Sequence, residues 1–501
     1  MLTIVVLAPV VLAAVLALLP TLSAQVSRWV WLVSSLAEVG VFAGLWIAYA
    51  NGAGRHGSNP IAFDVNWAWV PGAHSGWHVG LDGLSLPLLM MTAVVFAACA
   101  GYSWRQRERP RQFAALFLAL ESTCLGLFAA LDLIVFFLFF DLSIVGMYFV
   151  IAIWGRGSTR TASALKFFLY TFVGSLALLL GFIGLYVAAD PHTFDMVALT
   201  RQAPLHGHGA TGVLVLVAIA VGLAVKTPTF PFHTWLPPAH TDAPAAGSAV
   251  LAAVLLKMGT YGFVRIAMPM LPHAWRQLAW VFVVVGVISV LWGALVALAQ
   301  TSFKRMIAYT SVNHMGYVVL AVGAAGLLGG TDEQARSVAV TGAVVQMVSH
   351  GLITAALFLL AGTLFDRGGT YEMDDYGGLA ATMPRFATLT AVAAFASLGI
   401  PGFSGFIAEF QIFAGSLPSA TIATAVALLG ILITAGLFLW ALQRLLLGAP
   451  ATARTYRDLH VREYVPITLL LVGAFAIGIY PRLILDVIDP AARVAAQLVA
   501  R

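Results

Sequence analysis

Apolar stretches long enough to cross a membrane recur along the whole chain, each separated from the next by a short polar break. A bilayer core about 30 Å thick needs about 20 consecutive apolar residues in a helix. Counting the stretches gives about fourteen candidate spans. Their predicted ranges are 2–22, 27–50, 80–103, 112–131, 134–154, 162–189, 211–235, 245–267, 276–299, 304–327, 338–365, 386–412, 420–447 and 464–488. The pattern predicts an all-α integral membrane protein without a soluble domain, and residues 51–79 form its longest early loop.

The seventh and twelfth predicted spans are interrupted by helix-breaking residues. "KTPTFPFHTWLPP" at 226–238 holds four prolines, and "SLGIPGFSGF" at 397–406 holds three glycines and a proline. Irregular backbone at membrane depth survives only where protein or a water-filled cavity surrounds it. Paired interruptions in two inverted halves are typical of ion transporters. Spans 4–8 and 9–13 therefore form two predicted five-helix repeats, inverted because five is an odd number.

The repeats divide the chain into four predicted segments, and the basic residues orient them. The segments are residues 1–111 with helices 1–3, 112–267 with the first repeat, 268–447 with the second repeat, and 448–501 with helix 14. Arginines crowd the loop at 105–111, and by alternation the loops on that side, Lys304 included, carry about twice as many basic residues as the opposite side. That side is predicted to be cytoplasmic, with both termini outside. The first span lacks a basic start and is expected to be retained, not cleaved as a signal peptide.

Composition supports the membrane assignment and narrows the chemistry. Hydrophobic residues make up 61% of the chain and charged residues 9%, with a mean hydropathy of +0.94. Cys99 and Cys124 both fall inside apolar spans and are too few to hold an iron–sulfur cluster. No glycine-rich nucleotide fingerprint is present in the sequence. We expect no cofactor in this chain and no nucleic-acid partner, because membrane topology accounts for the pI of about 9.3.

Six ionisable residues lie inside six different predicted spans. They are Asp141, Lys226, Lys257, His314, His350 and Glu409. A charge at mid-membrane costs at least about 2.5–3.5 kcal/mol, so such residues are kept for a reason. One buried charge is explained by a structural ion pair, and each histidine alone is equally well explained by packing. Burial disfavours the charged forms of lysine and carboxylate, and histidine titrates near neutral pH. Together the six predict a proton relay across the membrane interior.

Other polar residues in the spans carry less weight. Glu38 and Glu121 could join the path, but a structural role is favoured for each. Asp132, at the end of a span, is expected to be exposed and to cap a helix, and Asp242 is expected to lie in a loop. His233 and His240 belong to the first break, where lining an access path and capping freed backbone groups are equally plausible.

Three segments carry a resemblance to a known family. "KTPTFPFHTWLPPAHTDAPAAGSAVLAAVLLKMGTYGFVR", "KRMIAYTSVNHMGY" and "GIPGFSGFIAEF" are similar to segments of the antiporter-like membrane subunits of proton-pumping NADH:quinone oxidoreductase, respiratory complex I. The likeness covers nearly all of the chain, and it is strongest to the M type. It implies a bacterial inner-membrane subunit that moves protons beside L-type and N-type neighbours. NADH, FMN, iron–sulfur clusters and quinone would be bound by partner subunits.

The resemblance also implies a role for each relay residue. Lys226 matches the lysine of the broken seventh helix, Lys257 the central lysine of the eighth, and His314 and His350 the histidines of a bridging polar axis. Glu409 matches the acid of helix 12, where L and N types usually have lysine. Asp141 departs from the family, which generally has glutamate there, so its carboxylate reaches one methylene less far.

Three other readings remain open from the sequence. The nearest is a subunit of a multisubunit sodium/proton antiporter or of a membrane-bound hydrogenase, because both share this fold. A solute carrier would need more polar side chains beside the breaks. A purely structural subunit would have no need of six buried ionisable groups.

Overall fold

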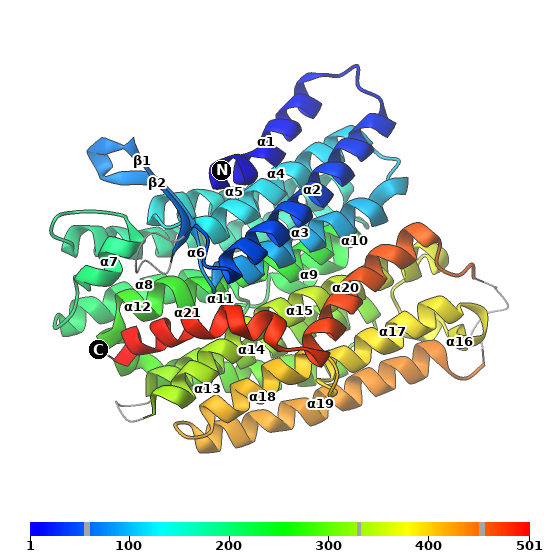
Figure 1. Ribbon diagram of the computed structural model, residues 1–501. Helices are drawn as coiled ribbons and strands as arrows, with labels where there is room; N and C mark the ends of the chain where they lie inside the picture. Colours follow the sequence, from blue (N-terminus) through cyan, green and yellow to red (C-terminus); the bar gives the residue numbers. More distant parts are fainter. Residues whose placement is uncertain (55–60, 328–331, 450–455, 501) are drawn as a thin grey trace.

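The computed structural model describes residues 1–54, 61–327, 332–449 and 456–500 and shows a bundle of long helices (Figure 1). Residues 450–455 and 501 of the predicted C-terminal segment lie outside the described residues. The first half contains α1 (Leu2–Leu18), α2 (Ala24–Ala50), β1 (Ala62–Val70), β2 (Ser75–Leu81), α3 (Ser85–Tyr102), α4 (Pro110–Ala129), α5 (Leu133–Trp154), α6 (Arg160–Ala188), α7 (Met196–Gln202), α8 (Gly209–Lys226), α9 (Leu236–Asp242), α10 (Ala245–Val250), α11 (Leu256–Gly262) and α12 (Met268–Met270). The second half contains α13 (Pro272–Leu298), α14 (Phe303–Leu327), α15 (Glu333–Gly368), α16 (Leu379–Thr382), α17 (Pro384–Ser397), α18 (Ser404–Ser416), α19 (Thr421–Leu446), α20 (Val461–Ile479) and α21 (Arg482–Ala500).

Each predicted span coincides with a helix or with an interrupted pair of helices. Within the described residues, eleven helical segments are long and apolar enough to cross a membrane. The remaining predicted spans correspond to α1, to α14 and to the pair α17 and α18. The protein is therefore a multi-pass, mostly helical membrane protein, as predicted. The exact number of crossings, the inverted repeats and the four segment boundaries stay predictions.

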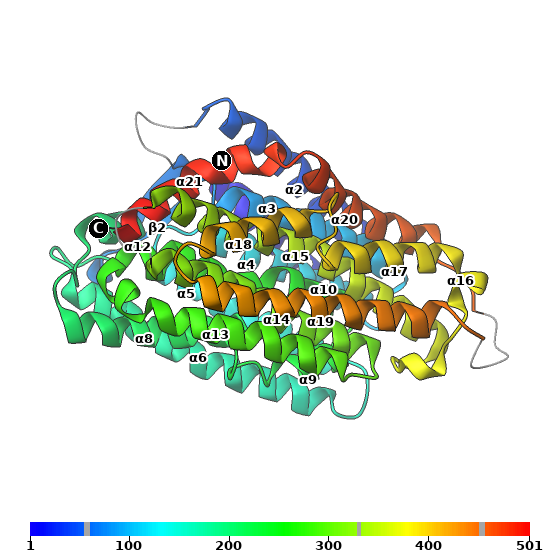
Figure 2. The ribbon, with the colours of Figure 1, turned by 90° about the horizontal axis from the view of Figure 1, so that it is seen from below.

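The centre of the bundle is formed by α15 and by the continuous helical segment Ala245–Met270 (Figures 1 and 2). Every residue in the most apolar window of α15 is buried, as are nearly all of those in Ala245–Met270. A helix that is apolar all round belongs in such a core. Outer helices such as α6 and α19 instead expose leucine and valine on one side, which suits lipid or partner helices.

Both predicted helix breaks occur where the prolines and glycines lie. α8 ends at Lys226 and α9 starts at Leu236, and α17 ends at Ser397 and α18 starts at Ser404. In the second break the backbone φ of Gly399 is +69° and that of Gly402 is +104°, a region that side-chain-bearing residues rarely adopt. The two breaks therefore follow directly from local sequence.

Two predicted segments differ from the structure. The loop at 51–79 contains an antiparallel hairpin of β1 and β2, in which Val65 pairs with Val79 and Trp67 with Trp77. The strands are mixed in polarity, so a hydropathy window merges them with the loop. The span predicted at 464–488 was wrong as one helix, because α20 ends at Ile479 and α21 starts at Arg482. Pro481 between them has no backbone N–H for a continuous helix.

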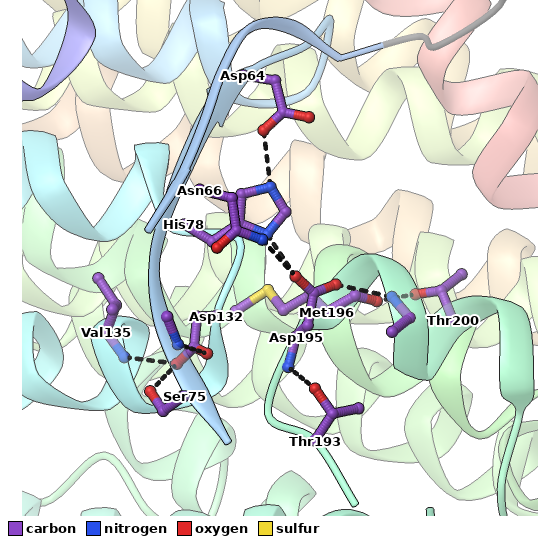
Figure 3. Close-up of polar contacts among 12 residues, drawn as sticks. Asp64, Asn66, Ser75, His78, Asp132, Val135, Thr193, Asp195, Met196 and Thr200 are labelled. Carbon is purple, nitrogen blue, oxygen red and sulfur yellow. Dashed lines mark hydrogen bonds and ion pairs between the residues drawn. The ribbon is translucent and has the colours of Figure 1, made fainter. Parts of the chain in front are cut away.

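A polar cluster attaches the hairpin to the helices beneath it (Figure 3). His78 Nε2 lies 2.7 Å from Asp64 Oδ1, and His78 Nδ1 lies 2.5 Å from Asp195 Oδ2 at the start of α7. Asp132 caps α5 through the backbone N–H groups of Ile134 and Val135, as expected. Its predicted exposure is wrong, because Asp132 is only 1% exposed beneath the hairpin. It also accepts a hydrogen bond from Ser75 on β2 at 3.0 Å. The hairpin is thus fixed to the ends of α5 and α7.

The two acids control the charge of His78. Burial lowers the pKa of His78, but the hydrogen bonds and charges of Asp195 and Asp64 outweigh burial and raise it above its ordinary value. For Asp195, burial raises the pKa, whereas the His78 hydrogen bond and the backbone N–H of Ala198 lower it further than burial raises it. Both shifts favour an imidazolium between two carboxylates.

Candidate proton-transfer site

Lys257 occupies the centre of the bundle on α11, between two π-helical segments at Leu251–Leu255 and Phe263–Ala267. Its side chain is fully buried, and Nζ donates a 2.6 Å hydrogen bond to the carbonyl oxygen of Ala252. The wider turns of a π-helix displace backbone carbonyls from regular α-helical pairing, and they recur at functional sites. The local backbone therefore supplies an acceptor for a lysine in the middle of an apolar segment.

Lys257, His350, His314 and Glu409 form one continuous buried group. Lys257 Nζ lies 2.6 Å from His350 Nδ1 on α15, and the rings of His350 and His314 are 5.3 Å apart. His314, on α14, has Nδ1 3.6 Å from Glu409 Oε1 on α18. A cavity of about 10 Å³ is lined by both histidines and Glu409, which is close to the space that one water molecule needs. Four titratable side chains from four helical segments are thus gathered in one buried cluster.

The second helix break makes room for the carboxylate of Glu409. A Cβ atom added at Gly399 would lie 2.5 Å from Glu409 Oε2. The glycine therefore serves two needs, because it adopts a positive φ and leaves space for an acid beside the break. Glu409 is only 6% exposed, so the break shelters the carboxylate within protein.

Lys226 and Asp141 lie together at the other break but do not form a direct ion pair. Lys226 is 1% exposed, and its Nζ donates a 3.0 Å hydrogen bond to Ser143 Oγ and lies 4.6 Å from the centre of the Phe140 ring. The Asp141 carboxylate exerts a favourable electrostatic effect on Lys226. Among the described residues, no ion pair within 4.0 Å joins the two. The shorter side chain of aspartate is consistent with this gap.

The structure therefore places the six predicted relay residues in two groups. One group is Asp141 and Lys226 with Ser143, and the other is the four residues from Lys257 to Glu409. Ser143 Oγ also lies 3.4 Å from the Sδ atom of Met258, the neighbour of Lys257 in sequence. No hydrogen bond in the described part of the chain joins Lys226 to Lys257. The two groups are linked by packing around Ser143 and Met258.

Three polar residues in the site were missed by sequence reasoning. Gln346 Nε2 lies 3.2 Å from His314 Nδ1, Ser397 Oγ lies 3.2 Å from His314 Nε2, and Ser143 contacts Lys226. Gln346 had a usable signal, because it lies one turn before His350 on an otherwise apolar helix. Serine in an apolar span gives no such signal, since its hydroxyl normally bonds the preceding turn.

The histidines of the first break are both buried. His233 Nε2 accepts a 3.1 Å hydrogen bond from Trp292 Nε1. His240 stacks on Phe358 with ring centres 4.5 Å apart, and neither of its ring nitrogens has a hydrogen-bond partner. Neither histidine caps a helix through its ring nitrogens in these contacts. The contacts are compatible with lining an access path and with packing.

Two residues near the first break have contacts that the sequence did not indicate. Lys304, counted among the basic residues of the predicted cytoplasmic side, is fully buried and donates to the carbonyl oxygen of Ala243 at 2.6 Å. It binds carbonyls at the end of α9, where the helix dipole favours a cation. Asp242, expected in a loop, is the last residue of α9 and accepts a 2.9 Å hydrogen bond from Thr159. The prediction of the side of Lys304 stays a prediction, whereas the placement of Asp242 was wrong.

The sequence of the chain matches a known family. The family described as "NADH:quinone oxidoreductase/Mrp antiporter, TM" matches residues 130–434. The chain is 39% identical over 437 residues to NADH-quinone oxidoreductase subunit M of Rickettsia bellii, covering 86% of this chain and 85% of the relative. It is 37% identical over 434 residues to F(420)H(2) dehydrogenase subunit M of Methanosarcina mazei, covering 85% of each.

The fold matches a solved structure over its full length. A chain of respiratory complex I from Thermus thermophilus with bound NADH superposes with a TM-score of 0.88 at 29% identity, covering 100% of both chains. Fold and site together define a multi-pass membrane protein with interrupted helices around a buried line of titratable side chains. The chain belongs to the NADH:quinone oxidoreductase/Mrp antiporter family of membrane subunits, and within that family it resembles M-type subunits over most of its length.

Proposed function

We propose that this chain is the M-type, proton-translocating membrane subunit of a NADH:quinone oxidoreductase. Redox chemistry in other subunits drives protons through Asp141, Lys226, Lys257, His350, His314 and Glu409. NADH, FMN, iron–sulfur clusters and quinone belong to those partners, and L-type and N-type chains are its expected membrane neighbours. The names of the relatives support this assignment. The subunit contributes to catalysis by the complex through proton transfer alone.

One observation carries the proposal: the buried cluster of four titratable side chains, Lys257, His350, His314 and Glu409. It runs from the π-helical centre of the bundle to the second helix break. A structural ion pair needs two residues, whereas this group has four titratable side chains on four helical segments. Short steps between titratable atoms are what proton transfer requires.

Replacing Lys226 or Glu409 with alanine tests the function in the intact complex. Proton pumping by reconstituted vesicles is expected to fall by about 100-fold or more, because each substitution removes a proton-transfer group. Assembly of the complex, followed by gel filtration and subunit composition, is expected to persist. Lys166→Ala is the matched control, since Lys166 is exposed on α6. Full pumping by either relay variant would refute the proposal.

The nearest alternative is a subunit of a sodium/proton antiporter, which shares the family description. A related question concerns the electron donor, because one relative belongs to an F(420)H(2) dehydrogenase. Purification of the chain with its native partners separates these cases. Co-purification with NADH-oxidising and iron–sulfur subunits supports the leading proposal, whereas a complex without redox subunits favours the antiporter.

We also propose a bacterial plasma-membrane location, with the β-hairpin and both termini on the outer side. The excess of basic residues on the opposite loops supports this orientation. Figure 1 is consistent with it, because the hairpin, α7, α12 and the C-terminus lie at one end of the bundle and α16 at the other.

A further inference from the structure

Two buried glutamates lie outside the proposed relay, on neighbouring helices near the N-terminus. Glu38 lies near the middle of α2 and is 5% exposed, and Glu121 lies near the middle of α4 and is fully buried. Ser35, one turn before Glu38, donates a 2.7 Å hydrogen bond to Glu121 Oε2. α2 packs directly against α4, so both acids belong to one helix–helix contact.

Neither glutamate has the partners of a structural carboxylate. In the described part of the chain, no salt bridge involves Glu38 or Glu121. Glu38 Oε2 and Glu121 Oε1 have no hydrogen-bond partner. The indole Nε1 of Trp31, one turn before Ser35 and 98% buried, is also without a partner. Unsatisfied polar atoms are rare in buried positions, and three in one helix contact point to a bound species.

Electrostatics identify that species as a proton. An ionised carboxylate in an apolar interior is very costly without a cation, and two such charges close together repel each other. No lysine, arginine or histidine contacts the two acids among the described residues. The pair therefore needs at least one proton to exist in this position.

The helix α4 also connects the pair to the proposed relay. α4 packs directly against α5, which carries Asp141 and the hydrogen-bond partner of Lys226, Ser143. The helix that carries Glu121 is therefore the direct neighbour of a helix of the Lys226 group.

We propose that Glu38 and Glu121 hold bound protons and form a proton-storage site that exchanges with the Lys226 group. In the stored state each carboxyl group carries its proton as an O–H. Exchange moves one of these protons to an unprotonated Lys226 and leaves one carboxylate beside one carboxylic acid. Return of a proton from the Lys226 ammonium restores the stored state. The storage function follows from the site itself, whereas the exchange step rests on the proposed function.

Infrared difference spectroscopy of the purified complex tests for the bound proton. A protonated buried glutamic acid gives a C=O stretching band that shifts in ²H₂O, and we expect this band near neutral pH. Glu121→Gln is expected to remove or displace it, and Ser35→Ala to shift it because a hydrogen bond to the carboxyl group is lost. Glu108→Gln, at an exposed position, is the matched control and should leave the band unchanged. An identical spectrum for wild type and Glu121→Gln would overturn the storage site.

A second measurement tests exchange with the relay. Proton pumping by Glu38→Gln and Glu121→Gln vesicles is expected to fall at least about tenfold, while Glu108→Gln pumps normally. Wild-type pumping by both variants would overturn the exchange step and leave the infrared result to decide storage. If the wild-type complex does not pump at all, the proposed function fails, yet the infrared band still reports the bound proton. A band that responds to sodium instead of pH would show that the acids bind a cation, which would overturn the proposal.

Discussion

At the scale of single residues, the helix breaks matter because of the side chains that they accommodate. Gly399 shows this most directly, since its missing side chain is replaced in space by the Glu409 carboxylate. Proline and glycine could be interpreted as breaks from the sequence alone. The use of the break to shelter an acid ten positions later could not, because it depends on where α18 places Glu409 relative to Gly399.

Gly399→Ala is expected to impair pumping and to destabilise the protein. The backbone strain at a positive φ costs about 1–2 kcal/mol, and the new methyl group pushes the carboxylate from its place. Proton pumping and the thermal unfolding midpoint of the complex report the two effects separately. Gly436→Ala is the control, because a Cβ there meets no atom within 4 Å and α19 is regular. Pumping at the wild-type rate by Gly399→Ala would contradict the spatial role of the glycine.

The burial of Lys304 cannot be predicted from its neighbours in the sequence. It follows the polar turn "QTSF", so its sequence context is that of a cytoplasmic loop. In the structure it binds carbonyls of Thr241 and Ala243 and lies against Tyr371. The burial of Lys304 arises from the first helix break, which carries the end of α9 over the start of α14.

Lys304→Met is expected to destabilise the protein, whereas Arg305→Met is expected to have little effect. Removing the ammonium leaves buried carbonyls unsatisfied, at a cost of about 1–3 kcal/mol for each. Arg305, the next residue, is exposed and provides a matched control. The thermal unfolding midpoint of the purified complex measures both. Equal midpoints for the two variants would show that the contacts of Lys304 are not stabilising.

At the scale of secondary-structure elements, the β-hairpin is the part that the hydropathy pattern did not predict. Its anchor joins His78 to two acids, 14 positions before it and 117 after it. A hydropathy analysis detects charged and polar residues in this region but gives no indication that they meet. Contacts over such sequence distances are determined by tertiary packing. The same holds for the contact between Lys257 and His350 and for the hydrogen bond between Ser397 and His314.

The attachment of the hairpin is expected to depend on pH. The pKa of His78 is raised, so its stabilising contribution is complete below the ordinary histidine pKa and is lost as pH rises through the raised value. The pKa of Asp195 is lowered, so its contribution is present above the ordinary aspartate pKa and is lost as pH falls through the lowered value. The hairpin should therefore be held most firmly at pH values between the ordinary pKa of aspartate and the ordinary pKa of histidine. It should loosen as pH rises through the raised pKa of His78.

Hydrogen exchange of residues 62–81 in the intact complex measures this dependence. His78→Gln should abolish the alkaline increase in exchange, whereas His74→Gln, at an exposed neighbouring position, should preserve it. Exchange that is equally slow at all pH values in the wild type would contradict the role of the imidazolium.

At the scale of the whole molecule, the six relay residues belong to two groups that meet around Ser143 and Met258. If protons pass through both groups in sequence, a slower step in either group lengthens the turnover time, and the two delays add. Ser143→Ala and Ser397→Ala weaken one contact in each group, with Lys226 and with His314. A lost hydrogen bond of about 1 kcal/mol slows its step about fivefold. For a single path, the turnover time of the double variant should exceed that of the wild type by the sum of the delays of the two single variants. Each turnover time is obtained from the initial proton-pumping rate of vesicles. Independent paths would instead leave a fast route in each single variant, so wild-type rates for both singles with a slow double variant would contradict one continuous relay.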